Sequence, residues 1–143
     1  MRKKTFLTLA FFSAIALAAV APAFAQDRVV AKIPFAFTVG SATLPSGDYE
    51  VRKVFANTLV IQNAATREAA MSITTPDSPK EIPGEAVLVF HKYGDTCFLS
   101  AVQAGEDRRV IGASRAERQA AKNVAEIAGK TPSSEVYVSA NTH

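Results

Sequence analysis

The sequence predicts a mainly β domain: a small antiparallel β-sandwich or open β-barrel of about seven or eight strands, with one late α-helix at about residues 115–128. Short segments alternate between apolar and polar residues, turn signals recur roughly every 8–12 residues, and a single strong helix start occurs late in the chain. Within the 143 residues we expect a signal peptide at 1–25 and, at 26–143, a single β-rich domain with a short polar C-terminal tail.

The first 25 residues have the order of a secretory signal peptide. Basic residues at 2–4 precede an apolar run over 6–21, and Ala23-Phe24-Ala25 satisfies the A-x-A rule, so we expect cleavage between Ala25 and Gln26. The alternative is a transmembrane anchor, but a run of about 16 residues is short for a bilayer span of about 20. We therefore expect an exported bacterial protein, periplasmic or extracellular, with no stable membrane anchor after cleavage.

The charge of the domain itself is balanced. The chain has 16 Lys and Arg against 13 Asp and Glu, but three of the basic residues lie at 2–4 and all the acidic ones follow residue 25. A formally neutral domain gives no support to a nucleic-acid partner. Cys97 is the one cysteine, so no intramolecular disulfide can form and a packed core has to stabilise the domain.

The first half of the domain contains several strand signals. Residues 32–39 alternate as a half-buried strand, in which Pro34 lacks an N–H and predicts a sheet edge or a bulge. Leu44-Pro45-Ser46-Gly47 predicts a type I turn at which the chain reverses. Further short strands are expected at 49–54, 59–61 and 69–73. The three prolines within 75–84 predict a surface loop that joins no strand ladder.

The strongest hairpin signal lies at 86–93 and 96–104, around Gly94-Asp95, where glycine at the first central position is typical of a two-residue II′ turn. This turn places Tyr93 opposite Thr96, Lys92 opposite Cys97, His91 opposite Phe98 and Phe90 opposite Leu99. Both faces are then apolar: Leu88, Phe90, Leu99 and Ala101 form one, and Val87, Val89, Phe98 and Val102 the other. We expect both faces to be covered.

A helix is expected to cover the second face. Ser114-Arg115-Ala116-Glu117 predicts a capping box, in which the glutamate reaches back to the serine, and Gly129 predicts the helix end. The stripe expected to pack on the sheet consists of Ala116, Ala120, Val124 and Ile127. After the helix, residues 135–139 alternate as a last short strand before the polar tail.

Several motifs together resemble a known family. They are IPFAFTVG at 33–40, LPSGDY at 44–49, FHKYGDTCFLS at 90–100 and SRAER at 114–118. In these motifs the chain is similar to an uncharacterised family of small exported bacterial proteins, over nearly the whole domain. The resemblance implies export and a shared fold, and it implies no activity. The chain departs from the family pattern at Ser46, where alanine is usual, and at Cys97, where an aromatic residue is usual.

Few residues offer recognisable catalytic chemistry. A Cys97–His91 nucleophilic dyad needs both side chains on one face, whereas the two-residue turn places His91 with Phe98 and turns Cys97 the other way. His91 and His143 are the only histidines, and no metal-ligand spacing appears, so we expect no metal site and no cofactor. Glu106-Asp107-Arg108-Arg109 is interpreted as a solvated hairpin tip.

The best candidate for ligand contact is the hairpin face that carries His91, Tyr93 and Phe98, although core packing is the commoner fate of such residues. The first hypothesis is a non-catalytic periplasmic or secreted β domain that binds an envelope protein or a small apolar ligand. The second is an envelope or surface structural subunit that pairs through an edge strand, near Pro34 or at the C-terminal strand. An enzyme of unfamiliar type around His91, Tyr93 and Asp95 ranks third.

Overall fold

The computed structural model of the chain describes residues 28–129 and 134–143. The expected signal peptide and its cleavage site between Ala25 and Gln26 lie outside the described residues. The predicted fold class is confirmed: the described residues are mainly β, with one helix late in the sequence. The elements are β1 (Arg28–Ile33), β2 (Phe37–Val39), β3 (Ala42–Leu44), β4 (Gly47–Phe55), β5 (Thr58–Asn63), β6 (Ala69–Asp77), β7 (Ala86–Tyr93), β8 (Thr96–Ala104), β9 (Asp107–Ile111), α1 (Arg115–Ala128) and β10 (Ser134–Thr142).

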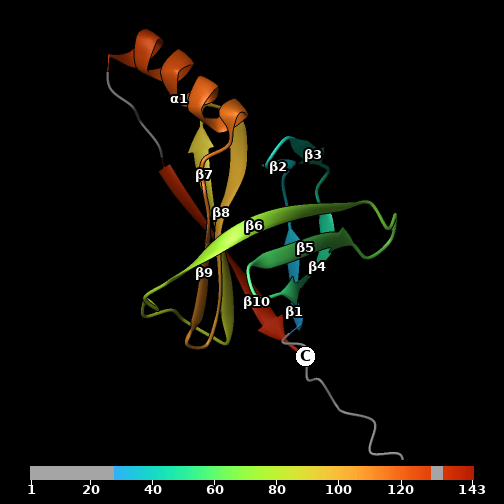
Figure 1. Cartoon of the computed structure of the whole chain (residues 1–143). Coiled ribbons are helices and arrows are strands. Elements are labelled where there is room, and N and C mark those ends of the chain that lie inside the picture. Colours follow the sequence, from blue (N-terminus) through green and yellow to red (C-terminus); the bar gives the residue numbers. More distant parts are fainter. Residues whose placement is uncertain (1–27, 130–133) are drawn as a thin grey trace, which may run out of the picture.

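Eight strands form a closed antiparallel barrel (Figure 1). Their order is β8-β7-β10-β1-β4-β5-β6-β9, and β9 pairs back with β8 to close the ring. The sequence predicted a sandwich or an open barrel, whereas the barrel is fully closed. Closure leaves none of these eight strands with a free edge. The two remaining strands, β2 and β3, form a small hairpin that joins β8 through a parallel pairing at Thr38 and Phe98.

Large side chains fill the barrel. Tyr49, Phe37 and Phe90 are at most 1 % exposed. The Phe37 ring meets the rings of Tyr49 and Phe90 edge-on, at centroid distances of 4.9 and 5.4 Å. The Tyr49 hydroxyl donates to the Pro45 carbonyl at 2.6 Å, so its polar end is satisfied. Burial of each such side chain stabilises the fold by roughly 1.5–3 kcal/mol, and the interior is accordingly a packed core.

Pro34 divides the expected strand at 32–39 into two. β1 ends at Ile33, opposite Gly47, and β2 begins at Phe37 in another part of the sheet. The prediction of an edge position is wrong, because β1 pairs with β4 on one side and with β10 on the other. The turn at 44–47 leads from β3 into β4, but these two strands have different partners and form no hairpin.

Two segments expected to be irregular belong to the barrel. β6 continues through Pro76 to Asp77 and pairs with β9, so the loop without ladder pairing is 78–85 rather than 75–84. The residues expected to form a polar C-terminal tail extend β10, since Ala140, Asn141 and Thr142 pair with β1. Polar residues can occupy these positions because alternate side chains point to solvent.

The β7–β8 hairpin has the predicted register next to its turn. Tyr93 faces Thr96 and His91 faces Phe98, and Gly94 has a φ of +60° whereas Asp95 does not have a positive φ, as a II′ turn requires. A β-bulge then inserts Ser100, whose hydroxyl donates to the Val89 carbonyl at 3.1 Å. The predicted faces are therefore exchanged beyond the bulge: Val102 points into the barrel and Ala101 points outward.

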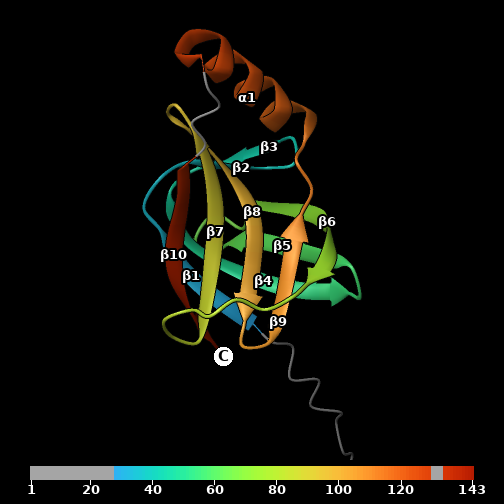
Figure 2. The ribbon, with the colours of Figure 1, turned by 90° about the vertical axis from the view of Figure 1, so that its left-hand side faces the viewer.

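The helix has the predicted bounds and the predicted left-handed end at Gly129, whose φ is +68°. It does not cover the second face of the hairpin: α1 lies at one end of the barrel, beyond the β7–β8 turn (Figures 1 and 2). Ala116 and Ile127 of the expected stripe are exposed, the latter by 88 %. Ile82 in the 78–85 loop covers that face instead. Within the described residues, no helix is long and apolar enough to cross a membrane.

Candidate functional site

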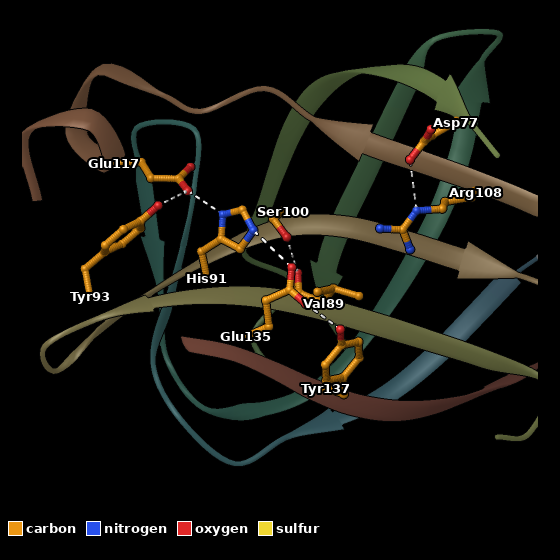
Figure 3. Close-up of polar contacts among 9 residues, drawn as sticks. All are labelled: Asp77, Val89, His91, Tyr93, Ser100, Arg108, Glu117, Glu135 and Tyr137. Carbon is orange, nitrogen blue, oxygen red and sulfur yellow. Dashed lines mark hydrogen bonds and ion pairs between the residues drawn. The ribbon is translucent and has the colours of Figure 1, made fainter. Parts of the chain in front are cut away.

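Polar side chains gather on the outer face of β7 and β10 (Figure 3). The antiparallel register places Glu135 opposite His91, Tyr137 opposite Val89 and Ser139 opposite Val87. Side chains of opposed residues lie on the same face of a sheet, and the alternate residues Leu88 and Phe90 are in the core. This outer face is bounded by the start of α1 at one end and by the 78–85 loop at the other (Figure 2).

Glu117 connects the helix to this face. One of its carboxylate oxygens lies 2.9 Å from Nδ1 of His91 and accepts a hydrogen bond from the Tyr93 hydroxyl at 3.2 Å. Glu117 is only 4 % exposed. Burial, together with the charge of Glu117, raises the pKa of Tyr93. The expected capping box is therefore half formed: Ser114 Oγ accepts from the Glu117 N–H, whereas the Glu117 carboxylate binds His91 and Tyr93 instead of reaching back.

His91 lies between two carboxylates. Its Nε2 is 3.8 Å from Glu135, on the side opposite to Glu117. The Tyr137 hydroxyl donates to Glu135 and lowers the pKa of that carboxyl, with smaller contributions from the positive charges nearby. The chain of contacts Tyr93–Glu117–His91–Glu135–Tyr137 thus runs from the helix to β10 (Figure 3).

The three residues expected to contact a ligand do share the outer face. The ring centroids of Tyr93 and Phe98 are 6.0 Å apart, and those of Tyr93 and His91 are 6.3 Å apart. Phe98, however, is only 4 % exposed, and Tyr93 and His91 are both occupied with Glu117. Cys97 points to the core, where burial raises the pKa of its thiol, so the predicted separation of Cys97 from His91 is confirmed.

A groove lies farther along this face, beneath the 78–85 loop. Its volume is about 440 Å³. Three residues supply apolar walls and five supply polar groups: the walls are Ile82, Pro83 and Val87, and the polar residues are Lys80, Glu81, Arg108, Tyr137 and Ser139. Tyr137, 58 % exposed, belongs both to the groove and to the chain of polar contacts around His91. None of His91, Tyr93 and Phe98 lines the groove.

Gln103 on β8 holds the loop over the barrel. Its Oε1 accepts the Lys80 backbone N–H at 3.1 Å, and its Nε2 donates to the Lys80 carbonyl at 2.7 Å and to the Gly105 carbonyl at 3.0 Å. Gln103 is 1 % exposed, so these bonds are shielded from water. One buried amide therefore fixes the roof of the groove by two reciprocal bonds to a single loop residue.

Arg108 forms part of the base of the groove. Its side chain is 8 % exposed; Nε lies 3.2 Å from Asp77 Oδ2, and Nη1 lies 3.4 Å from Gln103 Oε1. Asp77 has a lowered pKa, mainly because the Ser78 backbone N–H bonds to it and secondly because of Arg108. The interpretation of 106–109 as a solvated tip was wrong for Arg108. One sequence signal could have located Arg108. If Gly105 is read as part of a two-residue hairpin turn, the register places Arg108 opposite Gln103, as observed.

The described residues contain no group of three or more His, Cys, Asp or Glu that could hold a metal ion.

No family model, no curated protein and no solved structure matches this chain.

Proposed function

We propose that this protein is an exported, non-catalytic binding domain that works in the periplasm or outside the cell, and that its ligand is a small, largely apolar molecule. Export is argued from the order of charge, apolar run and A-x-A site in residues 1–25. The observation that carries the binding role is the groove between the 78–85 loop and the outer face of β7 and β10.

The groove has the size and lining of a ligand site. Small-molecule pockets typically measure about 300–1,000 Å³ and combine apolar walls with a few placed polar groups. Here Ile82, Pro83 and Val87 supply the walls. Because packed side chains occupy the barrel, binding on its outer face needs no rearrangement of the core.

The proposal moves the expected site by a short distance along the same face. His91 and Tyr93 are engaged by Glu117, and Phe98 is buried, so we assign these three residues to anchoring the helix. Tyr137 is the residue through which the two regions meet. The proposed role needs no catalytic dyad and no cofactor. This agrees with the positions of Cys97 in the core and His91 outside it, which keep the thiol and the imidazole apart.

A fluorescence titration tests this function. N-phenyl-1-naphthylamine is uncharged and brightens in apolar surroundings, and we expect it to bind the protein purified after expression of the full chain. Ser139→Trp places an indole in the groove and should abolish binding, whereas Met71→Trp, on an exposed position of β6 outside the groove, should leave it unchanged. Absence of saturable binding, or equal binding by the two variants, contradicts the proposal. Native mass spectrometry of protein from the exported fraction would identify a retained ligand.

A structural-subunit role is the second candidate, and one observation favours it. Phe55, Met71 and Ile73 are 62–76 % exposed on the outer face of β4 to β6, where Phe55 and Ile73 both lie opposite Thr58. β1 and β10 are paired on both sides and offer no edge, so contact would use this apolar face or the edge of the short strand β3, which pairs only with β2. Light scattering at high protein concentration tests it, and a strictly monomeric protein argues against the role.

A further inference from the structure

We infer that the ligand of the groove carries an anionic group, a carboxylate or a sulfonate, which binds between Arg108 and Lys80. This inference rests on the proposed function and makes it more specific. Its basis is a guanidinium that is more than nine-tenths buried at the base of an open groove.

The bonds of Arg108 leave part of its donor capacity unused. A guanidinium has five N–H donors, and burial of its charge is costly unless those donors are paired. Among the described residues, Nε bonds to Asp77 at 3.2 Å and Nη1 makes a long bond of 3.4 Å to Gln103. In Figure 3 the two terminal nitrogens point away from Asp77, to the side on which Glu135 and Tyr137 lie. The Nη edge is the one that an anion can bind with two parallel hydrogen bonds.

Lys80 adds a second positive charge at the rim. Its backbone is fixed by Gln103, so its side chain starts from a defined point on the groove wall. Lys80 and Arg108 both line the groove, and the positive charge of each lowers the pKa of Glu135 nearby. An anion between them would be held by one buried and one exposed cation.

Three acidic residues also surround the groove, and their exposure to solvent determines how strongly their negative charges oppose that of a bound anion. Glu81 and Glu135 are exposed, and the side chain of Asp77 is 48 % exposed, so water and salt screen their charges. Arg108 is buried, and charge interactions are stronger where water is excluded. In addition, Glu135 already accepts the Tyr137 hydroxyl and Asp77 the Ser78 N–H. The guanidinium is therefore the charge at the base of the groove that solvent screens least.

A matched pair of probes separates the anionic group from the apolar body. N-phenyl-1-naphthylamine is neutral, and 8-anilino-1-naphthalenesulfonate has the same ring system with one sulfonate added. We would measure the dissociation constants of both probes with the unmodified protein, Arg108→Gln and Lys80→Gln. The control is Lys122→Gln, which removes an exposed cation from α1, away from the groove.

The expected result is that the sulfonate binds about tenfold more tightly than the neutral probe, as a charge-assisted hydrogen-bonded contact implies. Arg108→Gln should reduce this ratio to near one, Lys80→Gln should reduce it by about two- to threefold, and Lys122→Gln should not change it. If Arg108→Gln fails to fold, the exposed Lys80→Gln variant and the salt dependence of the ratio of the two dissociation constants still test whether the ligand is anionic.

Equal binding of both probes, blocked by Ser139→Trp, would overturn the anionic assignment and leave the groove as a binding site. A preference for the sulfonate that is undiminished in Lys80→Gln and independent of salt would also overturn it. Failure of both probes to bind would refute the proposed function itself, and the assignment with it.

Discussion

Glu117 Oε1 on the first turn of α1 lies 2.9 Å from His91 Nδ1 on β7, across 26 residues of sequence. The helix contacts β7 of the barrel, and the exposed residues of its second half include Ile127. One buried carboxylate therefore attaches the first turn of the helix to the barrel. Because the same oxygen also accepts the Tyr93 hydroxyl, loss of Glu117 removes a hydrogen-bond partner from two side chains of β7 at once.

We predict that Glu117→Ala loosens the helix while the barrel stays folded. The expected loss in unfolding free energy is about 1–3 kcal/mol, because hydrogen bonds to a charged group typically contribute about 1.5–3 kcal/mol and His91 and Tyr93 are only partly buried. Hydrogen exchange should show faster exchange over 115–128 and little change in β1 to β6. Glu126→Ala, at an exposed position of the same helix, is the control and should have little effect. Unchanged protection of the helix in Glu117→Ala would contradict the anchoring role.

Gln103→Leu should release the 78–85 loop. Leucine has a similar size but cannot bond to the Lys80 backbone, so the variant should lose about 1–3 kcal/mol of stability. The Lys80 amide should exchange faster with solvent, and the affinity of the groove for the neutral naphthylamine probe should fall. Gln119→Leu, on the exposed side of α1, serves as the control. A loop that stays protected in Gln103→Leu shows that other contacts hold it.

Asp107 should contribute to stability in a pH-dependent way. Burial raises the pKa of its carboxyl, but the bonds from Lys53 at 2.9 Å and Arg109 at 2.7 Å outweigh burial and leave the pKa below its ordinary value. A lowered pKa means that the contribution is present above the unfolded pKa of about 3.9 and is lost as the pH falls through the folded pKa.

Urea unfolding of Asp107→Asn and the unmodified protein, followed by circular dichroism, tests this dependence. Since the Asp107 side chain is 38 % exposed, we expect a difference of only about 0.5 kcal/mol near pH 7, which shrinks as the pH falls below the unfolded pKa of about 3.9. A difference that does not change over this range would show that the ion pairs are not its cause.

Cys97 should be unreactive in the folded protein. It is 5 % exposed and burial raises the pKa of its thiol, so little thiolate is available. At pH 8 we expect an aromatic disulfide reagent to label native Cys97 at least about 100-fold more slowly than in urea. His91→Gln should leave the native rate unchanged. Rapid labelling that depends on His91 would restore the dyad excluded by the hairpin register.

Local signals predicted the parts of the structure that are determined locally. The positive φ of Gly94 set the register of His91 and Phe98, and Ser114 and Gly129 set the bounds of the helix. The bulge at Ser100 was not predictable in this way. Residues 96–104 are mostly apolar, so an extra residue leaves no visible break in their pattern, and the bulge becomes apparent only when the strand is paired with its partner. It exchanged Ala101 and Val102 between the two faces.

The candidate site was predicted less well, since it depends on contacts between distant segments. The face with His91 and Tyr93 was identified, but the groove requires the 78–85 loop to lie over β7, held by Gln103. The sequence of that loop indicates only that it is irregular. Arg108 likewise looked like one charge in a polar tip, although its pairing with Gln103 on β8 buries it.

The order of the strands around the barrel also determines when the fold can be completed during synthesis. β10 pairs with β1 on one side and with β7 on the other. β1, the first strand of the described residues, must therefore wait for one of its two neighbours until residues 134–142 have left the ribosome. Until then the nascent chain exposes one unpaired edge on β1 and one on β7, and open strand edges of this kind favour aggregation.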